Sequence, residues 1–63
     1  MIRLEHFSES TLALYNACKS GDVATSDLID VLLESDFSKK EIKSFLKKHF
    51  PVICVWLIEI YEL

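Results

Sequence analysis

The side chains in this sequence that are best suited to chemistry are two histidines and two cysteines. Catalysis or metal binding needs such groups at a defined spacing, as in a CxxC motif or a Cys/His cluster. Neither arrangement occurs, and Gly21 is the only glycine, which argues against a glycine-rich phosphate-binding loop. We therefore predict that the protein is not an enzyme and has no catalytic residues, no cofactor and no metal site.

The two cysteines, Cys18 and Cys54, have mostly apolar neighbours along the chain. In such surroundings a free cysteine behaves as a small hydrophobic residue, so we expect both to be reduced. Because disulfides are rare in the cytosol, this predicts an intracellular, cytoplasmic protein. The first ten residues lack the apolar region of a signal peptide. The longest apolar run, residues 52–58, is far shorter than the ~20 residues of a membrane-spanning helix.

Charge is unevenly distributed along the chain. Residues 38–49 hold five lysines and one glutamate, a charge of +4, while the rest of the chain carries −7 and the whole −3. Solvated helix faces of opposite sign would explain this pattern. A basic face that meets an acidic partner would explain it equally well. The candidate contact residues of such a face are Lys39, Lys40, Lys43, Lys47 and Lys48.

Capping residues and the spacing of apolar residues predict two helices in the first half of the chain. A first helix is predicted over residues 8–19, with Ser8 or Ser10 as its cap. Gly21 fits the left-handed position that follows a helix end. A second helix is predicted over residues 25–35, where apolar residues cover more than half of the circumference. Such a helix should contact neighbours on two sides.

The third segment has the clearest local signature. A helix is predicted over residues 38–49, where Ser38 and Glu41 have the spacing of a capping box. Its apolar residues form one narrow face, which His49 continues. We therefore expect this histidine to be packed and hydrogen-bonded rather than catalytic. The chain should leave the helix before Pro51, which is suited to the first position of a fourth helix.

The last segment, residues 52–63, is ambiguous. Several of its residues are β-branched, which favours a strand, but no second strand is evident to pair with it. As a helix it is apolar nearly all round, with Glu59 and Glu62 as its polar residues. A helix is favoured, and a strand paired with another chain or in a short hairpin stays open. In either case something must cover this segment.

Together these segments predict a single all-α domain over residues 1–63, a compact bundle of three to four short helices that dimerisation may complete. A chain of this length has a marginal core because it buries only about 60% of the surface that its unfolded form exposes. The predicted core residues are Leu14, Cys18, Leu28, Leu32, Ile42, Phe45, Leu46, Ile53 and Trp56.

The second and third helices resemble a helix-turn-helix unit over about 25 residues. Phe37 and Ile42 lie where such a unit needs apolar packing. The turn lacks glycine, Leu32 is bulky where a small residue is usual, and Ser35 replaces an apolar one. The helix over residues 38–49 has no Arg, Asn or Gln for bidentate base contacts. The resemblance implies DNA binding through the lysines, which we keep as an alternative function.

A membrane interface is the second alternative. The lysine-rich helix and an apolar tail that contains Trp56 and Tyr61 have the composition of an interfacial anchor. Glu59 and Glu62 would repel anionic lipid.

The leading hypothesis is a small non-enzymatic regulator or inhibitor that binds another protein and forms a homodimer through its apolar tail. Seven aromatic residues and the tail give this short chain more apolar surface than four short helices readily cover. Two-fold closure is the commonest way to bury such a surface. The predicted interface residues are Ile53, Trp56, Leu57, Ile60 and Tyr61.

Overall fold

The computed structural model describes residues 2–63, and this part of the chain is all-helical. A 3-10 turn, η1 (Leu4–His6), precedes the helices α1 (Glu9–Ser20), α2 (Thr25–Glu34), α3 (Lys39–His49) and α4 (Cys54–Tyr61). The predicted all-α fold is confirmed. Residues 52–63 contain no strand, so the strand alternative for the tail is wrong.

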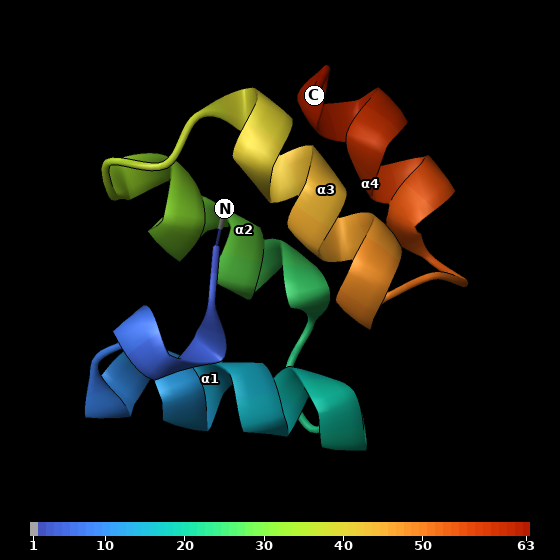
Figure 1. Cartoon of the computed structure of the whole chain (residues 1–63). Coiled ribbons are helices and arrows are strands. Elements are labelled where there is room, and N and C mark those ends of the chain that lie inside the picture. Colours follow the sequence, from blue (N-terminus) through green and yellow to red (C-terminus); the bar gives the residue numbers. More distant parts are fainter. Residues whose placement is uncertain (1) are drawn as a thin grey trace.

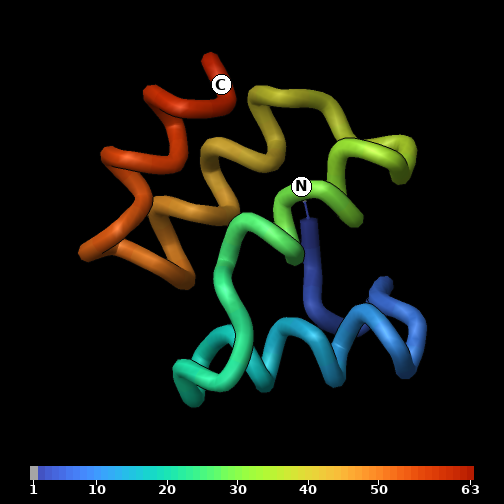
Figure 2. Tube along the Cα trace, turned by 180° about the vertical axis from the view of Figure 1, so that it is seen from behind, coloured from blue at the N-terminus to red at the C-terminus, as the bar shows by residue number. Residues whose placement is uncertain are grey.

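The helices pack in chain order: α1 contacts α2, α2 contacts α3 and α3 contacts α4 (Figure 1). Helix α4 runs antiparallel to α3 and lies at the edge of the molecule (Figures 1 and 2). The short N-terminal segment crosses from α1 towards the middle of the fold. Helix α4 packs mainly on α3, and its outer side carries exposed side chains.

Local capping explains where the helices begin and end. The Ser8 hydroxyl accepts a hydrogen bond from the backbone N–H of Thr11 at 3.3 Å. Gly21 ends α1 with φ of 85°, a conformation in which glycine avoids the strain that a side chain would add. The capping box of α3 is confirmed, with Ser38 and Glu41 exchanging hydrogen bonds of 3.2 Å in each direction.

The start of α4 differs from the prediction. Pro51 lies in a turn and is not the first residue of the helix, which begins at Cys54. The backbone N–H of Cys54 donates to the carbonyl of Phe50 at 3.0 Å. Phe50 is buried, so the chain has to complete this turn around an anchored aromatic ring before α4 can start.

The core lies where the four helices meet. Six of the predicted core residues are buried, and Leu14 is partly buried against them. Ile53 and Trp56 were wrongly assigned to the core, because their exposed fractions are 38% and 71%. Periodicity cannot orient a helix that is apolar all round, and the packing on α3 buries its other side. The burial of Cys54 agrees with the apolar surroundings expected for both cysteines. Core residues not anticipated from the sequence are Ile2, Tyr15, Ile29, Phe50 and Leu57.

Candidate interaction surface

The outer side of α4 carries the largest exposed apolar side chains of the described residues. Trp56 is 71% exposed, Ile60 69% and Val55 66%. Ile53, Trp56 and Ile60 are spaced i, i+3, i+7, which aligns them in one row along the helix. We call the following residues the α4 face: Val52, Ile53, Val55, Trp56 and Ile60.

The inner side of α4 anchors the helix. Cys54 and Leu57 are buried against the core, so Leu57, a predicted interface residue, is not part of the exposed α4 face. Tyr61, another predicted interface residue, is partly buried. Its hydroxyl lies 3.4 Å from the Ser26 carbonyl and 3.2 Å from Asp30 Oδ1. Burial and the nearby Asp30 carboxylate raise the pKa of Tyr61, which keeps the hydroxyl protonated as a donor.

The beginning of α4 is basic. A shallow groove of about 220 Å³ lies there, lined mainly by apolar groups together with one lysine. This lysine, Lys19, donates from Nζ to the His49 carbonyl at 2.6 Å and lies 5.1 Å from the centre of the Phe50 ring. The last turn of α3 adds Lys47 and Lys48. The groove is lined by Lys19, His49, Phe50, Pro51, Val52 and Ile53.

The end of α4 is acidic. Glu59 and Glu62 are both exposed, and the hydrogen bond from Tyr61 places Asp30 of α2 beside the same end. Lysines are absent from residues 50–63. The α4 face therefore runs from a basic end to an acidic one.

The five lysines of α3 do not form one surface. Lys39, Lys43 and Lys47 are spaced i, i+4, i+8, whereas Lys40 and Lys48 form a second row. The second row borders a pocket of about 250 Å³ whose floor includes Ile2 and Phe45. Four of these lysines are exposed and Lys43 is half-buried. They are candidates for separate contacts on two sides of the helix.

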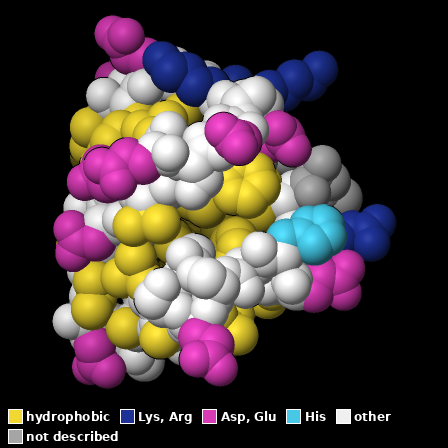
Figure 3. All heavy atoms as spheres, turned by 90° about the vertical axis from the view of Figure 1, so that its left-hand side faces the viewer, with side chains coloured by type: hydrophobic (Ala, Val, Ile, Leu, Met, Phe, Trp, Pro, Cys, Tyr) yellow, Lys and Arg dark blue, Asp and Glu magenta, His cyan; other side chains and the backbone are white. Residues whose placement is uncertain are grey.

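On one side of the molecule the acidic residues are also dispersed (Figure 3). Seen from the left-hand side of Figure 1, acidic side chains alternate with apolar and neutral ones over the surface (Figure 3). This spacing is typical of solvated helix faces and does not concentrate negative charge on one site.

His49 belongs to an aromatic cluster at the centre of the fold. Its Nδ1 lies 3.1 Å from the Tyr15 hydroxyl, and its ring packs 4.5 Å from that of Phe45, centre to centre. Burial lowers the pKa of His49, and the charges of Lys48 and Lys19 lower it further. The expectation of a packed, hydrogen-bonded histidine is confirmed.

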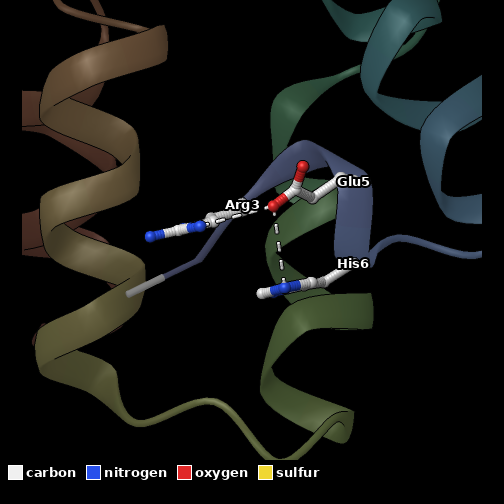
Figure 4. Close-up of polar contacts among 3 residues, drawn as sticks. All are labelled: Arg3, Glu5 and His6. Atoms are coloured by element: carbon white, nitrogen blue, oxygen red, sulfur yellow. Dashed lines mark hydrogen bonds and ion pairs between the residues drawn. The ribbon is translucent and has the colours of Figure 1, made fainter.

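The two cysteines and His6 lie where a role in packing or a surface contact explains them. Both cysteines are free and buried. Burial raises the pKa of Cys18, so its sulfur is a thiol rather than a reactive thiolate. Near the N-terminus, Glu5 contacts Arg3 at 3.4 Å and His6 at 4.0 Å on an exposed surface (Figure 4). Such exposed pairs contribute little to stability.

Within residues 2–63, no three histidine, cysteine or carboxylate side chains come together in a way that could hold a metal ion. No helix in this part of the chain combines the length and apolar character needed to cross a membrane. Comparisons with known protein families, with curated proteins and with solved structures found no match. The functional assignment therefore rests on the geometry of the α4 face.

Proposed function

We propose that this protein is an interaction module that binds an apolar surface of another protein through the α4 face. The observation that carries the proposal is the exposure of Val55, Trp56 and Ile60, each about two-thirds open to solvent on one short helix. Exposed apolar clusters of this kind mark interaction sites in small soluble domains. The α4 face is continuous, and its helix is anchored on the inner side by Leu57 and Tyr61.

Trp56 is expected to be the energetic centre of the contact. It lies in the middle of the α4 face, with Ile53 and Ile60 one turn away on each side. Tryptophan is among the residues that contribute most at protein interfaces, particularly at the centre of the contact. Fully burying a large apolar side chain is worth about 1.5–3 kcal/mol, which a partner would gain here.

We assign the module a regulatory or inhibitory role. The histidines and cysteines described above are engaged in packing or lie on an open surface, so binding itself is the effect that this chain can exert. A protein that acts by binding changes its partner by covering a surface or by stabilising one state of it. The exposed α4 face and the structural surroundings of the reactive side chains support this proposal.

The proposal is tested by photo-crosslinking in cells that naturally produce the chain. A photoreactive benzoylphenylalanine replaces Trp56 in one variant and Leu12 in the other. Leu12 is the matched control because it is an exposed apolar residue, 37% open, on α1 and away from the α4 face. We expect protein adducts from position 56 and none from position 12, with mass spectrometry identifying the crosslinked residues.

Equal labelling from both positions, or none from position 56, would contradict the proposal. Adducts with nucleic acid instead of protein would favour the lysines of α3 as the working surface. That alternative carries a second signature, because binding through lysine–phosphate contacts weakens steeply with salt. Adducts with lipid alone would favour the membrane interface and contradict the protein-binding role.

A further inference from the structure

The two ends of α4 have complementary surfaces, which points to a specific partner for the α4 face. The beginning of the helix has an apolar groove beside Lys19, and the end has Ile60 with Glu59 and Glu62. A surface that carries both halves of a contact can bind a copy of itself in an isologous, two-fold arrangement.

We infer that the α4 face binds a second copy of this chain, with the two α4 helices antiparallel and Trp56 near the two-fold axis. This inference rests on the proposed function and names its partner. Ile60 of one copy covers the apolar groove at Val52 of the other, and Glu62 approaches Lys19. The same contact occurs twice, once at each end of the helix pair.

The position of Trp56 supports the antiparallel register. It lies midway between Val52 and Ile60, the first and last residues of the α4 face. Antiparallel pairing about Trp56 therefore sets Val52 opposite Ile60 and Ile53 opposite Glu59 of the second copy. Large aromatic side chains at the centre of an interface, surrounded by apolar neighbours, are the arrangement found at strong contacts.

Charge selects this orientation over the parallel one. Antiparallel pairing brings the basic end, with Lys19 and Lys47, to the acidic end, with Glu59 and Glu62. Parallel pairing would place lysines against lysines and carboxylates against carboxylates, which is unfavourable at an interface. The dipole of α4 acts in the same sense, since antiparallel helices place opposite ends together.

A dimer sets a requirement on the area of the contact. A stable interface covers about 800 Å² on each partner, roughly a fifth of the 4297 Å² surface of this chain. The α4 face and the groove beside Lys19 are contiguous because both contain Val52 and Ile53. Lys47 lies in the last turn of α3, just before this groove in the chain.

Charge reversal at the two ends gives a sharp test. Lys19→Glu and Glu62→Lys are prepared separately, and circular dichroism verifies that each folds. In either variant alone, the ends that meet carry like charges, and we expect the dimer dissociation constant to rise about tenfold or more. An equimolar mixture should recover the wild-type affinity, because every contact in the mixed dimer again joins opposite charges. Sedimentation equilibrium measures all three samples and the wild type.

Because Lys19 also contacts His49 and Phe50, Lys47→Glu mixed with Glu62→Lys serves as a second pair. Higher salt should weaken the wild-type dimer only partly, since the apolar contact does not depend on ionic strength. A wild-type chain that stays monomeric to submillimolar concentration overturns the inference. So does a mixture that dimerises no better than its components.

The crosslinking experiment separates this inference from the proposed function. Adducts from position 56 that contain a different protein, without any adduct between copies, retain the interaction module but refute the second copy. Adducts between copies, with position 56 joined to residues 52–60, support the second copy and the α4 face as the binding surface. If no other protein is crosslinked, they contradict the regulatory role toward a different protein. The absence of any adduct at position 56 refutes both.

Discussion

Helices α3, of 11 residues, and α4, of 8 residues, lie side by side, but they distribute their apolar residues in opposite ways. In α3 the apolar residues form one narrow face, which is buried, and lysines cover the rest. In α4 apolar residues lie on both sides, so packing on α3 buries Leu57 and leaves Trp56 exposed. The apolar face of α3 is therefore covered by its own chain, whereas the outer side of α4 is left exposed, and we propose that another chain covers it.

The largest effect should come from the buried face of α3. Leu46 is fully buried, and Leu46→Ala should lower the free energy of unfolding by about 2–5 kcal/mol because it leaves a cavity. For a chain of this length that loss is comparable to the whole stability. Urea denaturation followed by circular dichroism measures it. Val52→Ala on the exposed end of α4 is the control and should stay within about 0.5 kcal/mol.

The outer face of α4 should behave in the opposite way. Trp56→Ser removes a side chain that is 71% exposed, so we expect little change in the stability of the monomer. Self-association should weaken by about 2 kcal/mol or more, roughly 30-fold in the dissociation constant. Sedimentation equilibrium and thermal unfolding of the same samples separate the two effects. If Trp56→Ser instead lowered the stability of the monomer and left the dimer dissociation constant unchanged, Trp56 would have the structural role that we assign to the buried face of α3.

The helix starts provide a smaller contrast. Ser38→Ala removes the hydroxyl that accepts from the Glu41 N–H and should cost about 1 kcal/mol of stability. Helix α4 has no side-chain cap at Ile53, so Ile53→Ala should affect folding less. Chemical denaturation of both variants tests the order. A larger loss of stability for Ile53→Ala would show that this residue packs against the chain itself.

The smallest effect is expected from pH. Since the pKa of His49 is lowered below its ordinary value of 6.5 in the folded chain, the unfolded chain takes up the proton first as pH falls. The contribution of His49 to the free energy of unfolding is therefore constant above pH 6.5, its ordinary pKa. This contribution decreases as the pH falls below 6.5 and levels off once the pH is below the pKa of His49 in the folded chain.

Urea midpoints measured from about pH 8 to about pH 5 test this dependence. His49→Gln should remove the part of the slope that His49 causes, while His6→Gln on the exposed N-terminal turn should retain it. An unchanged slope in His49→Gln would assign the effect to other groups.

Much of the local structure could be predicted because its causes are local. The capping box at Ser38 and the left-handed Gly21 depend on residues within one turn of each other, and both were confirmed. The packed character of His49 also followed from the narrow apolar face that it continues. The role of Tyr15 could not be anticipated, because its partner His49 is 34 residues away in the chain.

The exposure of the tail could be predicted for the segment but not residue by residue. Residues 52–63 were recognised as a surface in need of cover, and Trp56 and Ile60 do lie exposed on it. Leu57 was placed in the interface, and Ile53 and Trp56 were placed in the core as well. A helix that is apolar all round has no polar side to indicate which residues face inward.

The sequence by itself determined the helices, most of their ends and the apolar excess of the tail, since propensity, capping and periodicity act within a few residues. Only the tertiary structure decided which side of α4 is open and that its ends carry opposite charge. Those properties depend on contacts between distant segments, such as Lys19 with His49 and Tyr61 with Asp30. Such contacts arise from three-dimensional packing, which the order of residues within one helix does not encode.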